Sequence, residues 1–270
     1  MPDEPVSTLS DVTRAYGGVP VIDSISLAID PGVTAVIGPN GSGKSTLLRL
    51  LVGATEPTTG EVRHPGATGP KPIGYLPQRV PFRDGFTARE TLAFYARLVG
   101  GDPDAALEQV GLADAGDRRV EALSGGMRRL LGIAQAVLGD PTLVALDEPA
   151  SGLDPGMRER AFRAAAERAD RDTAVVVSSH ALDLVDDHAD RVVLLRRGGV
   201  AVAGPLDRLL DDHAVDDVSG LYRAVTAAEE RTGAERSDEE GGDGDAESDE
   251  EERDGGDTEP DVHVTGVSER

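Results

Sequence analysis

The chain has 270 residues, of which 50 are Asp or Glu and 27 are Lys or Arg, so its formal net charge at pH 7 is −23. That length fits one large domain or two small ones with a substantial hydrophobic core, and the composition excludes collagenous, coiled-coil and disulfide-stapled classes. The chain contains no cysteine, which excludes disulfides, thiolate metal sites and cysteine nucleophiles.

The first third of the chain shows the alternation and the turn residues that are typical of short strands. Two alternating stretches flank the Gly17–Pro20 turn and predict a hairpin that forms an edge sheet. A compact apolar run then enters a glycine-rich turn and is followed by a helical pattern. The elements expected here are strands at 6–16, 21–29 and 33–37, a helix at 46–52, and short strands at 61–63 and 73–76.

From Thr87 to about residue 139 the pattern becomes helical, with no convincing strand. Thr87 followed three residues later by Glu90 predicts a capping box at the start of the first helix. Asp102 and Pro103 suit the N-cap and the first turn of a second helix, and a third helix is expected from Gly126. This block reads as a helical insertion.

Strands return after the helical block, at 143–146, 174–177 and 192–195. A helix that starts at Asp154 and Pro155 separates the first two of these strands, and one or two closing helices are expected within 205–230. Alternation of strands and helices predicts βαβ units, and therefore a parallel sheet with helices on its faces.

The acidic residues are concentrated at the C-terminal end, where residues 229–270 hold 18 acidic residues and four arginines. Such a low-complexity segment cannot bury enough apolar surface to offset chain entropy. We therefore place the folded domain at residues 1–232 and a disordered acidic tail at residues 233–270. The rest of the chain is also acidic, and because it would repel nucleic-acid phosphates, we expect no nucleic-acid partner.

Lysine is almost absent, with Lys44 and Lys71 the only two in the chain. This composition resembles cytosolic proteins of salt-loving archaea, in which molar salt shortens the Debye length to about 3 Å. A GC-rich genome is the alternative. The N-terminus lacks the basic residues of a signal peptide, and no apolar run approaches the roughly 18 residues of a membrane span. We expect a cytoplasmic chain that does not cross a bilayer.

A glycine-rich turn lies between the strand predicted at 33–37 and the helix predicted at 46–52. It matches the pattern G-x-x-x-x-G-K-[ST] of phosphate-binding P-loops. Glycines let backbone N–H groups face an anion, the Lys44 ammonium reaches the β/γ-phosphates, and the Ser45 hydroxyl binds Mg²⁺. The loop consists of Gly38, Pro39, Asn40, Gly41, Ser42, Gly43, Lys44 and Ser45.

A P-loop requires a carboxylate for its metal, and the strand predicted at 143–146 supplies one in Asp147. At the carboxyl end of a parallel strand, Asp147 is placed to hold Mg²⁺ through water. Glu148 comes next, and it can polarise the attacking water as a general base.

A third motif begins the helix predicted from Gly126, and it consists of Leu123, Ser124, Gly125, Gly126 and Met127. With the P-loop and the Asp147–Glu148 strand end, it resembles the signature motif of ABC-type ATPases. The resemblance covers about residues 5–215. At the position of Met127 the family more often has Gln. Members that resemble exporter ATPases often have Met there.

The resemblance implies an α/β fold. A P-loop NTPase core with a parallel sheet flanked by helices is joined by an N-terminal antiparallel β subdomain. A helical insertion at about 87–139 carries the signature motif. ATP and Mg²⁺ are the implied cofactors.

The resemblance also implies roles for single residues. Tyr16 is similar to the aromatic that stacks on adenine, and Thr46 adjoins the P-loop among the ATP contacts. Gln78 resembles the Q-loop residue, which contacts Mg²⁺ or water and couples to a membrane partner. His180 resembles the switch histidine that contacts the γ-phosphate. The D-loop, which crosses the dimer interface, corresponds to Ser151, Gly152, Leu153 and Asp154.

The implied mechanism needs two copies of the ATPase, most simply as a homodimer. The N–H groups of the signature turn form a second anion site with no ligand of its own. Two chains packed head to tail would close each ATP between the P-loop of one and the signature turn of the other. ATP binding then drives closure, and hydrolysis weakens it.

The function implied is an ATP-hydrolysing subunit of a membrane transporter, held at the inner face of the membrane by a separate permease chain. Residues 87–98 resemble ATPases of export-type systems. The alternative is a soluble ABC-type ATPase that acts in translation or on chromosomes. Translation-type members usually have two cassettes in one chain, and chromosome-type members insert a long coiled coil between the P-loop and the signature motif. This chain has one cassette and only 78 residues between Lys44 and Leu123. A regulator that binds ATP without turnover is opposed by the presence of Glu148 and His180.

Overall fold

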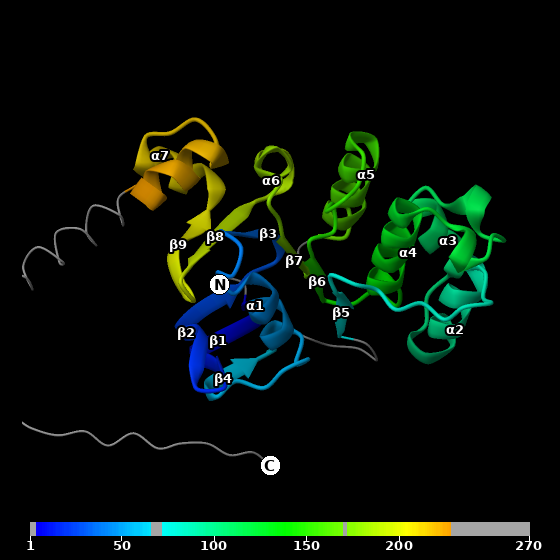
Figure 1. Ribbon diagram of the computed structural model, residues 1–270, viewed down its shortest axis with the longest axis horizontal. Helices are drawn as coiled ribbons and strands as arrows, with labels where there is room; N and C mark the ends of the chain where they lie inside the picture. The colour runs from blue at the N-terminus through cyan, green and yellow to red at the C-terminus, as the bar shows by residue number, and fades with distance from the viewer. Residues whose placement is uncertain (1–3, 66–71, 170–171, 228–270) are drawn as a thin grey trace, which may run out of the picture. The chain divides into compact units, whose positions relative to one another are not determined.

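Figure 1 shows a computed structural model of the chain, which describes residues 4–65, 72–169 and 172–227. The chain divides into two units, residues 1–229 and residues 230–270, and every described residue belongs to the first. The tail expected at 233–270 lies outside the described residues, so its disorder stays a prediction.

The N-terminal strands form a three-stranded antiparallel sheet in the order β2-β1-β4. Its members are β1 (Ser7–Tyr16), β2 (Val19–Ile29) and β4 (Thr59–Arg63). The predicted hairpin is confirmed, since β1 and β2 pair directly around the turn at Gly17 and Gly18. This sheet is the antiparallel subdomain that the sequence indicated.

The second sheet has six strands in the order β5-β6-β7-β3-β8-β9, and only β9 runs antiparallel to its neighbour. Every residue of β6 and β7 is buried, which explains the apolar runs Leu143–Leu146 and Ala174–Val177 that precede their last residues, Asp147 and Ser178. The six strands are β3 (Gly32–Ile37), β5 (Ile73–Leu76), β6 (Leu143–Asp147), β7 (Ala174–Ser178), β8 (Arg191–Arg196) and β9 (Gly199–Pro205).

Helices cover both faces of the second sheet. Along β7, Val176 packs in the core cluster that contains Leu47 of α1 (Lys44–Leu51), whereas Val175 packs in the cluster that contains Phe162 of α5 (Pro155–Ala166). Because successive strand residues face opposite ways, α1 and α5 lie on opposite faces. Helix α1 contacts strands of both sheets and therefore lies between them.

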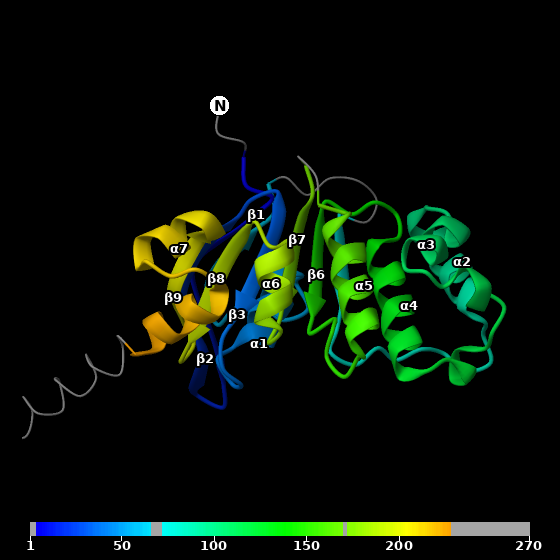
Figure 2. The same ribbon diagram turned by 90° about the horizontal axis from the view of Figure 1, so that it is seen from above.

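Two further helices complete the coverage of the sheet. Figure 2 shows α6 (Leu182–His188) in a row with α5 along one face, and α7 (Leu206–His213) beside β9. A last helix begins at Val218 and is described as far as Ala227. Among the described residues, none of the helices is long and apolar enough to cross a bilayer.

The helical insertion is present, and it contains α2 (Ala88–Val99), α3 (Pro103–Gln109) and α4 (Gly125–Val137). The predicted capping box is confirmed, since the Glu90 amide donates to Thr87 Oγ1 and the Thr87 amide donates to Glu90 Oε2. Helix α4 lies between the β5–β6 edge of the sheet and the α2–α3 pair (Figure 1). The signature turn is thus attached to the core through α4.

Among the described strands and α-helices, β9 and α6 were not anticipated from the sequence, and neither were the short 3-10 helices at Ala113–Ala115 and Val120–Ala122. β9 contains two glycines, two alanines and a proline, all of low strand propensity, and its hairpin partner β8 supplies the pairing. α6 is only seven residues long and includes three aspartates, which are weak helix formers. The predicted helix at 46–52 begins two residues earlier, at Lys44.

Helix α4 approaches β5 closely because glycines stand at the contact. A side chain on Gly74 of β5 would collide with the carbonyl oxygen of Ala136, and one on Gly132 of α4 would lie 2.6 Å from Leu76 Cδ1. The absence of side chains at these two positions sets how near α4 lies to the sheet edge.

We predict that Gly74→Ala destabilises the protein by about 1–3 kcal/mol, because the new methyl group forces α4 away from β5. Gly156→Ala is the matched control, since its methyl group would meet only Asp154 Oδ1 at 3.5 Å. The control should be neutral or stabilising by up to about 1 kcal/mol. Urea unfolding of the full chain measures both changes, and equal stability of the two variants would contradict this packing.

Candidate functional site

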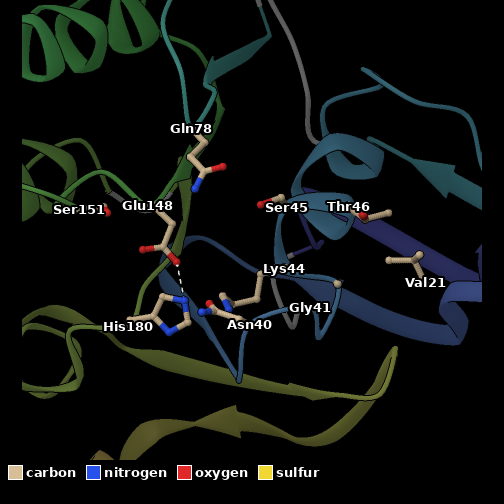
Figure 3. Close-up of a pocket in the computed structure, with 11 residues that line it drawn as sticks. Val21, Asn40, Gly41, Lys44, Ser45, Thr46, Gln78, Glu148, Ser151 and His180 are labelled. Carbon is tan, nitrogen blue, oxygen red and sulfur yellow. Dashed lines mark ion pairs between the residues drawn. The ribbon is translucent and has the colours of Figure 1, made fainter.

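A pocket of about 490 Å³ opens at the carboxyl edge of the parallel sheet. Figure 3 shows Gln78, Glu148 and His180 on one side of it, with Lys44 and Ser45 facing them from the other. The lining residues come from β2, the P-loop and α1, and the segments after β5, β6 and β7. They are Val21, Asn40, Gly41, Gly43, Lys44, Ser45, Thr46, Gln78, Glu148, Ser151 and His180.

The predicted P-loop connects β3 to the N-terminus of α1. Gly43 is the N-cap of α1 and has a φ of 104°, in the region that favours glycine. A side chain at Gly43 would also meet Ile22 Cδ1 at 2.6 Å and the Val21 carbonyl oxygen at 2.8 Å. The first turn of α1 contains no acidic residue, so its partial positive charge is not neutralised locally. This helix end is suited to an anion.

Lys44 lies at the mouth of this loop and is 7% exposed. Its Nζ donates to the carbonyl oxygens of Gly38 at 2.8 Å and Pro39 at 3.1 Å. Burial lowers the pKa of Lys44, while the charges of Glu148 and Asp147 oppose that shift. The ammonium is therefore held in place by backbone oxygens.

The Asp147 carboxylate is fully buried at the end of β6. Its Oδ1 accepts hydrogen bonds from Ser45 Oγ at 3.0 Å and from Ser178 Oγ at 2.8 Å. Its Oδ2 is buried and has no hydrogen-bond partner within the part of the chain that the structure describes. Since buried carboxylate oxygens normally have a partner, this oxygen is available to bind a cation.

Glu148 follows Asp147 directly and faces His180, with 3.0 Å between Glu148 Oε1 and His180 Nε2. Burial raises the pKa of Glu148, although the charges of His180 and Lys44 oppose this, and Asp147 adds to it. Glu148 has a φ of 53°, which is rare for a residue with a side chain. Its backbone N–H donates to Ser178 Oγ at 2.9 Å.

Some of the predicted ATP contacts do not line this pocket. Gly38, Pro39 and Ser42 contribute to the loop behind it, and Tyr16 stands to one side, 43% exposed. The guanidinium carbon of Arg14 lies 4.6 Å from the centre of the Tyr16 ring. Hydrogen bonding to Arg14 is the main cause that lowers the pKa of Tyr16, and Thr46 contributes as well.

The signature turn also lies away from the pocket of its own chain. Ser124 is the N-cap of α4, and its Oγ accepts from the Met127 amide at 3.1 Å, while Leu123 is buried. A side chain at Gly126 would collide with Met157 of α5, whereas one at Gly125 would meet open space. Helix α5 therefore packs closely against this turn at Gly126.

The D-loop residues continue from the pocket toward α5. Ser151 lines the pocket, and Gly152 and Leu153 line an adjoining cavity of about 250 Å³ together with Glu148 and His180. Asp154 is confirmed as the N-cap of α5, because its Oδ1 accepts from the Met157 amide at 3.0 Å.

Three residues of the site escaped the sequence analysis. Val21 reaches the pocket from β2, and Ser178 connects Asp147 with the Glu148 amide. Arg129 of α4 donates to the carbonyl oxygens of Gln78, in the segment after β5, and Glu148, in the segment after β6. The Ser178 contact follows from the parallel register that pairs it with Asp147, so knowledge of strand order would have revealed it.

Comparisons with known proteins identify the family of this chain. Residues 22–151 match the family described as ABC transporter. The chain is 32% identical over 228 residues to Nod factor export ATP-binding protein I of Rhizobium etli, covering 79% of the chain and 72% of that protein. It is 41% identical over 199 residues to zinc import ATP-binding protein ZnuC of Paracoccus denitrificans, covering 71% and 76%. The chain belongs to the ABC transporter family.

Solved structures support the same assignment. A structure described as the ATP-binding subunit of an ABC transporter has a TM-score of 0.73 and 25% identity, covering 82% of this chain and 99% of that one. A nucleotide-free ATP-binding cassette at 23% identity and a TM-score of 0.67 shows the shared fold. This ABC protein binds ATP and is the ATPase that powers a membrane transporter.

The raised pKa of Glu148 leads to a prediction about stability. A carboxyl whose pKa is raised on folding stabilises the protein below its ordinary pKa, and this contribution is lost as the pH rises through the raised value. We therefore expect Glu148→Gln to be more stable than the natural protein at neutral pH, with the difference vanishing near about pH 4.

Denaturant midpoints measured across this pH range test the prediction. Glu167→Gln is the matched control, because Glu167 is exposed on the surface and its replacement should change little. A Glu148→Gln variant that is less stable than the natural protein at neutral pH would show that the ion pair with His180 outweighs the burial of the carboxylate.

Proposed function

We propose that the pocket binds ATP with Mg²⁺ and hydrolyses it, with Glu148 as the general base. The observation that carries this proposal is the Glu148–His180 pair, which faces Lys44 and Ser45 across the pocket (Figure 3). A base on one wall and phosphate-binding groups on the other leave space for a terminal phosphate and a water between them.

The triphosphate would lie against the P-loop. Backbone N–H groups of the loop and the N-terminus of α1 would surround the phosphates, and Lys44 would exchange its contacts with Gly38 and Pro39 for phosphate oxygens. Tyr16 would support the adenine from the side of Thr46, with Val21 closing that end of the pocket.

The residues present fit a magnesium ion. Ser45 Oγ and the unpaired Oδ2 of Asp147 are the hard oxygen donors that Mg²⁺ prefers, and the Gln78 side chain points toward the same space (Figure 3). Magnesium bound there would neutralise phosphate charge. Ser178 would keep the Asp147 carboxylate in a fixed orientation through Oδ1.

In hydrolysis, Glu148 would accept a proton from the water that attacks the terminal phosphorus, while the bond to the ADP oxygen breaks. Its raised pKa makes it a stronger base than an ordinary carboxylate. His180 would hold the Glu148 carboxylate and contact the terminal phosphate. ADP and inorganic phosphate are then the products.

A second ATPase subunit would complete the site. The signature turn of Ser124 to Met127 does not line the pocket of its own chain, yet it offers the N-terminus of a 13-residue helix. Packed head to tail, two copies would place that turn against the partner's terminal phosphate. The D-loop at Ser151, which already reaches the pocket, would lie at the contact between the copies.

A permease would hold the protein at the inner face of the membrane. The segment after Gln78 forms a small apolar pocket of about 110 Å³ whose lining residues include Phe82, Phe86, Phe94 and Tyr95. Phe94 is 49% exposed although it is aromatic, and an exposed apolar surface of this kind indicates a protein contact. We place the permease contact here, directly beside the Q-loop.

The first test of this proposal is Glu148→Gln. Loss of the base should lower kcat on the order of 10²- to 10⁴-fold and leave the Kd for ATP nearly unchanged. Phosphate release and nucleotide binding measure the two effects, and gel filtration with ATP should show a trapped dimer. Glu167→Gln is again the control. Full turnover by the Glu148→Gln variant would exclude this residue as the base.

The second test is Phe94→Asp, which places a charge in the apolar pocket. We expect the variant to separate from membranes that retain the natural protein, while its hydrolysis of ATP in isolation stays the same. Phe94→Leu keeps the apolar surface and should stay with the membrane. Membrane retention of Phe94→Asp equal to that of Phe94→Leu would move the permease contact elsewhere.

A further inference from the structure

Arg129 of α4 places all five of its guanidinium N–H donors on backbone carbonyl oxygens. Nη1 donates to Pro77 at 2.9 Å and to Gln78 at 2.7 Å. Nη2 donates to Asp147 and, at 2.7 Å, to Glu148, and Nε donates to Pro149 at 3.4 Å. One side chain therefore connects the segment after β5 with the segment after β6.

The arrangement of these carbonyl oxygens explains why an arginine is suited to position 129. Strands β5 and β6 pair in parallel as far as Leu76 and Leu146. Beyond that pair the described residues of the two strands form no further ladder pairs, and Arg129 donates to the carbonyl oxygens that follow. The Glu148 carbonyl also accepts from the Ser151 N–H. The flat guanidinium offers five donors in a fixed fork, whereas a lysine offers three on a single nitrogen.

Arg129 has no carboxylate within ion-pair distance among the described residues. Burial lowers the pKa of its guanidinium, and the charges of Asp147 and Glu148 are the leading opposing influences. Arg129 is partly buried, and a partly buried cation that forms no direct ion pair gains less from its charge than from its hydrogen bonds. The hydrogen bonds of Arg129 instead fix the position of backbone carbonyl groups.

The main chain at Glu148 is the part that most needs to be held. With a φ of 53°, Glu148 is in a backbone region that side-chain-bearing residues rarely adopt, and such geometry persists only where its surroundings enforce it. Ser178 Oγ accepts from the Glu148 N–H, and Arg129 donates to the Glu148 carbonyl. Both polar groups of this peptide backbone are thus anchored, which aims the carboxylate at His180.

We propose that Arg129 is a positioning residue for ATP hydrolysis, acting through the main chain of Glu148 and Gln78. This inference rests on the proposed role of Glu148 as the base. Arg129 itself does not line the pocket, so it holds the groups that do. Arg129 lies on α4, five residues after Ser124. Through the Arg129 guanidinium, the position of the Glu148 carboxylate therefore depends on the position of α4.

The test compares Arg129→Met, Arg129→Lys and the control Arg163→Met, whose arginine pairs with Glu159 at the surface of α5. We expect Arg129→Met to lower kcat on the order of 10²-fold, since a displacement of about 1 Å at the base suffices for that. The Kd for ATP should change less than about twofold, because the P-loop contacts remain. Arg129→Lys should recover part of kcat, and Arg163→Met should match the natural protein.

A double variant separates positioning from general loss of structure. If Arg129 acts through Glu148, then adding Arg129→Met to Glu148→Gln should change the residual single-turnover rate less than about twofold. A further large loss of rate in that background, or a loss of ATP affinity that parallels the loss of kcat, would overturn the inference. So would an unchanged kcat in Arg129→Met.

If Arg129→Met does not fold, as judged by its melting curve, Arg129→Lys decides the matter. A lowered kcat with unchanged Kd supports the inference, and a natural kcat overturns it. Failure of the proposed function is distinguishable, because then the natural protein would hydrolyse no ATP or Glu148→Gln would retain full turnover. An active natural protein with an inactive Glu148→Gln variant and a fully active Arg129→Met variant would refute only the role of Arg129.

Discussion

A buried carboxylate at the end of a parallel strand is the constraint on which this structure depends. Asp147 is fully buried, and two hydroxyl groups, from Ser45 of α1 and Ser178 of β7, share its Oδ1. A charge in that environment must be paired or hydrogen-bonded, so it ties three segments together at one edge of the sheet. The P-loop and the Glu148 segment are brought to the same place as a result.

The sequence was most informative where local rules and burial agree. Uninterrupted apolar runs identified β6 and β7, the capping box identified the start of α2, and the glycine pattern identified the phosphate-binding loop between β3 and α1. In these places the local sequence is sufficient to determine the local structure. The residues gathered around the pocket were therefore mostly found in advance, including Gln78 and His180.

The remaining features depend on pairings that no local pattern encodes. Ser178 could not be assigned until β6 and β7 were known to be neighbours in register. Arg129 looks like any polar residue of an amphipathic helix, and its partners lie about 20 and 50 residues away along the chain. Strand β9 was missed because its partner β8, rather than its own composition, makes it a strand. Tertiary context decided all three.

The location of α1 has a consequence for how the pocket can change. Six of its eight residues are buried and it is enclosed by two sheets, so its amide protons should be among the slowest in the molecule to exchange with solvent. The opposite wall consists of short connections that leave strand ends at Gln78, Glu148 and His180. Rearrangement during a transport cycle would then fall on that wall, with the helix serving as the stationary reference.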